Sequence, residues 1–93
     1  MTLHIVSKSP FSSSALSDCA NAVRDGDALL LIEDGVYALS REMPEKLAAA
    51  KLYCLAADAA ARGLAVPGSI EAIDDARWVS LCTEHHPVVS WFK

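Results

Sequence analysis

Hydrophobic residues in this chain occur in short blocks that polar turns separate. The longest block, residues 28–32, is apolar at every position and ends abruptly at Glu33, Asp34 and Gly35. A strand without polar alternation is covered on both faces, which is typical of a central strand in a parallel sheet. Its acidic end is foremost a chain reversal, because Asp-Gly is a common turn pair. It is also a candidate functional rim, because open α/β sheets receive ligands at the carboxyl ends of their strands.

The other apolar blocks predict four more strands and the helices between them. Strands are expected at residues 2–6, 51–56, 69–73 and 88–91. A helix is expected after the first strand, because its apolar positions follow the i, i+3, i+4, i+7 spacing of one helical face. Further helices are expected near 44–50, 58–62 and 74–85. This alternation predicts one α/β domain over residues 1–93, a three-layer sandwich with a mainly parallel sheet between helices.

Several polar residues and glycines mark the expected turns and helix ends. The serines at 12–14 precede the first helix and are expected to cap it. Asp74 and Asp75 favour the start of the last helix, and Gly63 is a typical left-handed helix stop. At Gly35 the turn predicts a backbone with positive φ, which only glycine adopts at little cost.

The charge of the chain argues against several classes of partner. Its formal net charge is −4, and its eight Lys and Arg residues are scattered, whereas proteins that grip a nucleic-acid backbone cluster them. No apolar run approaches the ~20 residues that span a bilayer, and the N-terminus lacks the charged-then-apolar order of a signal peptide. We therefore expect a cytoplasmic chain with no direct contact to nucleic acid or membrane.

The hydrophobic content predicts a protein partner instead. A chain of 93 residues buries a modest core, yet 53% of this one is hydrophobic. Trp91 and Phe92 stand near the C-terminus, where chains are usually polar. These aromatic side chains are expected to be buried against this domain or against a partner. Part of the apolar surface is therefore expected to meet another subunit.

Cys19, Cys54 and Cys82 are the candidate nucleophiles. They are odd in number and lack a CxxC pair, so free thiols are expected rather than disulfides or a zinc ribbon. We single out Cys19, although it lies on the apolar face of its helix, where a buried and inert thiol is the usual outcome. Cys54 stands within an apolar strand and is expected to be core.

Cys82 and His85 stand three positions apart on the last predicted helix, in an apolar stripe with Trp78 and Leu81. Two such side chains are half of a metal site or a cysteine–histidine pair, and His4 joins them only if the fold brings the first strand near. We favour core packing plus a histidine at a helix C-terminus. No metal and no cofactor is expected, since phosphate-binding glycine loops and a GxSxG elbow are also absent.

The order of several short motifs resembles one known family. They are LHIVSKSPF at 3–11, the helix with SDC at 17–19, LLLIEDGVYA at 29–38, LYCLAADAAARGL at 52–64, and HPVVSW at 86–91. Together they span essentially the whole chain and resemble the DsrH/TusB family. The resemblance implies a DsrE/F/H-like fold and a subunit of a heterohexameric sulfur-relay complex. Such a relay passes persulfide sulfur toward 2-thiolation of the wobble uridine of tRNA.

The resemblance also implies partners and a role for one cysteine. The partners would be TusC/DsrF-like and TusD/DsrE-like subunits, with a TusE/DsrC-like protein as the sulfur acceptor. The principal sulfur-accepting cysteine belongs to the TusD/DsrE partner, so this chain is not expected to be the main catalytic subunit. Cys19 matches a cysteine that is linked to the relay in DsrH-like members and absent from some TusB members. It is therefore a possible persulfide carrier.

Two alternatives stay open beside tRNA thiolation. The chain is either a DsrH-type subunit of a sulfur-oxidation complex or a purely structural subunit whose cysteines are inert. An independent hydrolase or nucleotide-binding enzyme is disfavoured, because no matching motif is present.

Overall fold

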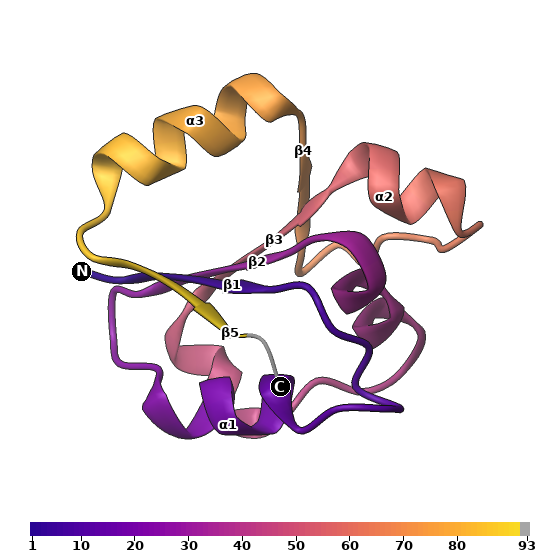
Figure 1. The fold of residues 1–93 in the computed structure, drawn as a ribbon, viewed down its shortest axis with the longest axis horizontal. Helices are drawn as coiled ribbons and strands as arrows, with labels where there is room; N and C mark the ends of the chain where they lie inside the picture. The colour runs from indigo at the N-terminus through magenta and orange to yellow at the C-terminus, as the bar shows by residue number, and fades with distance from the viewer. Residues whose placement is uncertain (92–93) are drawn as a thin grey trace.

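The computed structural model describes residues 1–91 and contains a five-stranded parallel sheet (Figure 1). The strands lie side by side in the order β4-β3-β2-β1-β5. Their bounds are β1 (Leu3–Val6), β2 (Ala28–Leu31), β3 (Lys51–Leu55), β4 (Glu71–Ile73) and β5 (Val88–Trp91). The block at 28–32 forms the middle strand β2, every residue of which is buried, as its unbroken apolar pattern predicts.

Helices cover both faces of this sheet and complete three layers. The α-helices are α1 (Ala15–Ala22), α2 (Ala56–Ala61) and α3 (Asp75–Glu84), and α1 and α3 lie on opposite sides of the sheet (Figure 1). The connection from β2 to β3 differs from the expected α-helix, because it consists of two 3-10 helices, η1 (Glu33–Ser40) and η2 (Glu45–Ala49). Pro44 lies just before η2, where its missing N–H costs no hydrogen bond.

Alternate residues of the strands supply two separate cores. The larger core lies on the α1 side, where Val6, Leu29, Leu31 and Cys54 pack against helical residues. The second core lies on the α3 side and contains the intervening strand residues, such as Leu30. Because side chains alternate along a strand, the fully apolar β2 serves both cores.

Gly35 is not left-handed, so the expected positive φ at this position is wrong. The left-handed residue of this turn is Glu33, with a φ of 48°. Gly35 is required for a different reason: its backbone passes so close to β1 that a Cβ atom would overlap the carbonyl group of Val6, with 2.9 Å to the carbonyl carbon. The positive φ of 66° at Gly63 agrees with the predicted helix stop.

The predicted capping is confirmed at the start of α3 but not at the start of α1, where the Ser14 side chain makes no capping hydrogen bond. The Asp74 carboxylate accepts a hydrogen bond from the Arg77 backbone N–H at 2.9 Å. Ser14 precedes α1, but the serine that accepts a backbone hydrogen bond is Ser13, from Ala15 at 3.1 Å. Within residues 1–91, no helix is long and apolar enough to cross a membrane.

Candidate functional site

Cys19 lies on the inner side of α1, in the larger core. Its side chain is fully buried, with 0% of its surface exposed, among apolar groups that include Leu16, Leu29 and Leu31. Burial, together with the negative charge of Asp27, raises the pKa of the Cys19 thiol to about 12. Because the thiolate is the reactive form, this thiol is unreactive in the conformation observed.

The other two cysteines have opposite environments. Cys54 is buried in β3, as predicted, and burial raises the pKa of its thiol. Cys82 is exposed, so its predicted place in the apolar stripe of α3 is wrong. Leu81 is the one buried residue of α3, with Trp78 partly buried beside it. The face of α3 that packs against the sheet is therefore too narrow to include Cys82.

No cysteine–histidine pair forms a metal site in the part of the chain that the structure describes. Within residues 1–91, no group of three or more His, Cys, Asp and Glu side chains is arranged so that it could hold a metal ion. His85 ends α3, and its Nδ1 atom lies 3.0 Å from the carbonyl oxygen of Leu81. The predicted position of His85 at a helix C-terminus is thus confirmed.

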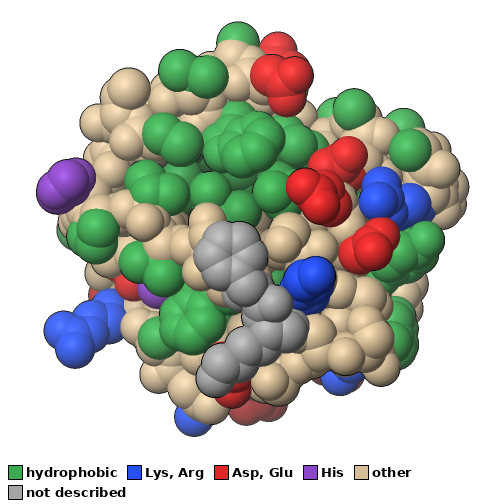
Figure 2. All heavy atoms as spheres, in the orientation of Figure 1, with side chains coloured by type: hydrophobic (Ala, Val, Ile, Leu, Met, Phe, Trp, Pro, Cys, Tyr) green, Lys and Arg blue, Asp and Glu red, His purple; other side chains and the backbone are tan. Residues whose placement is uncertain are grey.

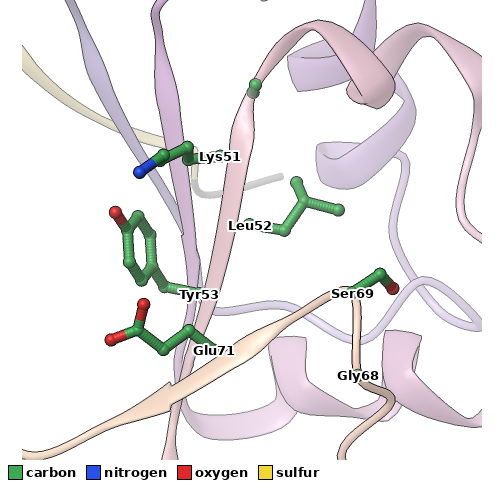
Figure 3. A pocket seen from close by; sticks show the side chains of 7 residues that line it. Lys51, Leu52, Tyr53, Gly68, Ser69 and Glu71 are labelled. Atoms are coloured by element: carbon green, nitrogen blue, oxygen red, sulfur yellow. The ribbon is translucent and has the colours of Figure 1, made fainter.

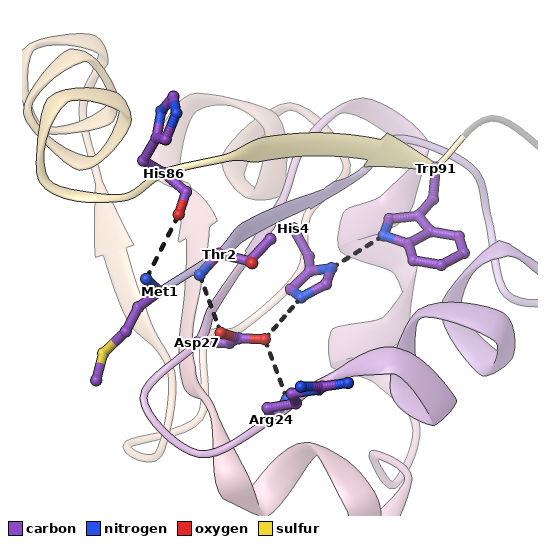
Figure 4. A network of polar contacts seen from close by, with 7 residues as sticks. All are labelled: Met1, Thr2, His4, Arg24, Asp27, His86 and Trp91. Carbon is purple, nitrogen blue, oxygen red and sulfur yellow. Dashed lines mark hydrogen bonds and ion pairs between the residues drawn. The ribbon is translucent and has the colours of Figure 1, made fainter.

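A buried pair, His4 and Asp27, joins β1 to the turn before β2 (Figure 4). His4 alternates along β1 with Leu3 and Ile5 of the α3-side core, so it faces the α1 side of the sheet, where Cys19 lies. The His4 Nε2 atom in β1 is 3.0 Å from Asp27 Oδ2, and these residues are 4% and 6% exposed. The same carboxylate accepts backbone hydrogen bonds from Thr2 at 2.9 Å and Arg24 at 3.0 Å. Burial alone would raise the pKa of Asp27, but these hydrogen bonds outweigh it, and the pKa lies below its ordinary value.

Trp91 extends this pair to the C-terminal strand. Its indole N–H donates to His4 Nδ1 at 3.2 Å, and the two rings are stacked with centroids 6.1 Å apart. Because an indole N–H only donates, His4 Nδ1 is the acceptor, and Nε2 carries the proton donated to Asp27. The contacts fix His4 as a neutral imidazole in one tautomer. The expectation for the terminal aromatics holds for Trp91, which is half-buried, whereas Phe92 lies outside the described residues.

Sequence reasoning missed this network. His4 was considered only as a possible metal ligand, and Asp27 was not singled out. One signal was present: His4 stands between apolar residues of a short strand, and buried polar side chains require hydrogen-bond partners. The partners lie 23 and 87 positions away in the sequence, so their identity depends on the fold.

The acidic rim at the end of β2 is held by internal contacts. The Glu33 backbone N–H donates to Asp58 Oδ2 at 2.7 Å, and Arg62 donates to Asp34 Oδ1 at 3.0 Å. The Arg62 guanidinium also lies over the Tyr37 ring, 5.8 Å from its centroid. These contacts join η1 to α2, which agrees with the interpretation of this segment as a chain reversal.

An open pocket of about 500 Å³ lies at the amino ends of β3 and β4, remote in sequence from Cys19 (Figure 3). The side chains of Lys51, Tyr53 and Glu71 point to one side of these strands, and those of Leu52 and Ser69 to the other. The pocket includes no cysteine or histidine. It therefore gives no support to a relay role.

Comparisons with known proteins agree with the motifs in the sequence. The model of a family described as "DsrH like protein" matches residues 8–88. Protein TusB of Pectobacterium parmentieri is 34% identical over 95 residues, which cover 96% of this chain and 99% of that protein. Protein TusB of Pectobacterium atrosepticum is 33% identical with the same coverage. The chain therefore belongs to the DsrH/TusB family.

Proposed function

We propose that this chain is the TusB/DsrH-type subunit of a sulfur-relay complex that passes persulfide sulfur toward 2-thiolation of the tRNA wobble uridine. The observation that carries the proposal is the similarity to two TusB proteins over nearly the full length of each chain. The proposed partners are TusC/DsrF-like and TusD/DsrE-like subunits, and a TusE/DsrC-like protein accepts the sulfur. The scattered positive charge supports a subunit that leaves tRNA to another protein.

The surface supports a role in assembly. Phe11, Val79 and Val88 are 66%, 65% and 42% exposed. Apolar side chains gather on the side of the molecule between α3 and β5 (Figure 2). Contiguous apolar surface of this kind marks sites of protein association. We therefore propose that burial of such surface against partner subunits stabilises the chain.

Cys19 is the proposed persulfide carrier of this subunit, in the assembled complex. Its thiolate would attack the outer sulfur of a donor persulfide. The donor S–S bond breaks as a new S–S bond forms at Cys19, and the donor cysteine leaves as a thiolate that takes up the proton lost from Cys19. This exchange is redox-neutral and requires only that the two sulfur atoms meet. The buried state of Cys19 implies that transfer follows a local opening, and proximity to a bound partner then replaces intrinsic reactivity.

Assembly is the first test of this proposal. Expressed alone, the chain is expected to self-associate or to be poorly soluble, and co-expression with TusC-like and TusD-like proteins is expected to yield one stable mixed complex. Size-exclusion chromatography with light scattering measures both outcomes. Cys19→Ser is the matched control, because a carrier thiol is dispensable for assembly and this variant should co-elute with the partners. A monodisperse monomer that ignores both partners would contradict the proposal.

A further inference from the structure

His4 and Trp91 connect the two ends of the chain at the larger core. Both nitrogen atoms of the His4 ring are engaged, one with Asp27 and one with Trp91 (Figure 4). Trp91 packs against the core cluster that contains Cys19, and β5 contacts α1, the helix that carries this cysteine. The indole ring is thus part of the cover over the Cys19 side of the sheet.

The strand that carries Trp91 is well suited to local opening. Within residues 1–91, β5 is an edge strand of four residues whose one paired neighbour is β1. Val88 and Ser90 on this strand are exposed. Short edge strands with few buried side chains open at a lower free energy than central strands. By contrast, β2 and β3 are paired on both sides, so Cys54 in β3 should become accessible only when the fold opens more widely.

We propose that Trp91 is a latch: its hydrogen bond to His4 holds β5 over the core, and release of β5 gives a sulfur donor or acceptor access to Cys19. Asp27 sets the tautomer of His4, because its carboxylate keeps the proton on Nε2 and leaves Nδ1 free to accept a hydrogen bond from the indole N–H. Burial, and after it the negative charge of Asp27, disfavours the Cys19 thiolate in the observed conformation. This inference rests on the proposed carrier role of Cys19.

The test compares two tryptophan variants of the full chain. Trp91→Phe keeps an aromatic ring but removes the N–H that binds His4. Trp78→Phe is the matched control, because Trp78 is also partly buried but belongs to the core on the opposite side of the sheet. Iodoacetamide alkylation is followed at each cysteine by peptide mass spectrometry under native conditions, at a dilution at which the chain does not self-associate. Exposed Cys82 reports reagent activity, and buried Cys54 reports wider unfolding.

The latch predicts that Trp91→Phe speeds alkylation of Cys19 by about tenfold, the effect of one buried hydrogen bond on an opening equilibrium. The rate at Cys54 should stay unchanged, and Trp78→Phe should not favour Cys19 over Cys54. Equal acceleration of Cys19 and Cys54, or no acceleration, would overturn the latch.

Wild-type protein supplies a second test that needs no variant to fold. Hydrogen exchange should show the β5 amides opening before those of β2, and Cys19 should be alkylated before Cys54. A Cys19 rate that equals the Cys54 rate would refute local opening. Alkylation requires no sulfur donor and no partner, so failure of the latch leaves the relay proposal intact. Equally, a chain that carries no sulfur can still show the latch.

Discussion

Asp27→Ala should lower the free energy of unfolding by about 3–5 kcal/mol, because several hydrogen-bond donors lose a buried acceptor and each unsatisfied buried group costs about 1–3 kcal/mol. The substitution leaves three donors without their acceptor: the backbone N–H groups of Thr2 and Arg24, and Nε2–H of His4. The cost is largest for the buried Nε2–H group and smaller for the two part-buried backbone N–H groups, and such costs do not simply add. In a domain of this size the melting temperature should fall by at least about 12 °C, as calorimetry can measure.

Asp25→Ala is the matched control for Asp27→Ala. Asp25 is an exposed carboxylate in the same turn, so its loss should change stability by less than about 0.5 kcal/mol. Equal effects of the two substitutions would show that the buried His4–Asp27 pair does not contribute to the free energy of unfolding.

The stabilisation from Asp27 should also depend on pH. Its pKa is lower in the folded state than in the unfolded chain. Its electrostatic contribution is therefore fully present above the unfolded value of about 3.9 and is lost as the pH falls toward the folded value. The stability difference between wild type and Asp27→Ala should be largest near pH 7 and should shrink below about pH 4. A difference that is constant from pH 7 to pH 3 would contradict this assignment.

Gly35→Ala should destabilise the fold by about 3 kcal/mol, and Gly35→Val by more. The added Cβ would overlap the carbonyl group of Val6, and backbone atoms of a buried strand end relax less readily than a side chain. Thermal and denaturant melts measure the loss. In open space at a negative φ, the same substitution would instead be neutral or stabilising.

Substitutions at two other glycines distinguish steric overlap from backbone strain. Gly63 has open space but a φ of 66°, so Gly63→Ala should cost about 1–2 kcal/mol. Gly68 has open space and lies outside the left-handed region, so Gly68→Ala should be close to neutral. A Gly35→Ala protein as stable as Gly68→Ala would show that η1 does not need its close approach to β1.

The fold could be predicted from the sequence because its main signal is local. The unbroken apolar run of β2 and the helical spacing around Cys19 each reflect which faces are buried. The two 3-10 helices could not be predicted this way, since their short stretch between β2 and β3 has no long periodic pattern. The role of Gly35 was misread for a related reason. An Asp-Gly motif indicates that the turn needs the backbone freedom of glycine. It does not indicate that β1, which is distant in sequence, leaves no room for a side chain at Gly35.

The candidate site could be predicted only in part. Helical spacing placed Cys19 on the inner face of α1, and the resemblance to a known family gave it a role. The exposure of Cys82 was missed, because helical spacing does not tell how many residues of α3 are buried against the sheet. That number depends on how closely the helix packs on the sheet. The polar groups near Cys19 were also missed. Asp27, His4 and Trp91 are far apart in the sequence, and only the pairing of the strands brings them together. Tertiary contacts, rather than local pattern, set the reactivity of this thiol.

Persulfide loading of the assembled complex tests the central claim most directly. The complex, carrying Cys82→Ser to remove the exposed thiol, is treated with a persulfide donor, and adducts are mapped by mass spectrometry. We predict the added mass of one sulfur atom on Cys19, at lower occupancy than on the cysteine of the TusD-like partner, with Cys54 unmodified. Cys19→Ser should weaken tRNA thiolation only partly. If Cys19 stays unmodified while the partner's cysteine is fully loaded, and Cys19→Ser supports thiolation at the normal rate, the carrier role is wrong and the subunit is structural.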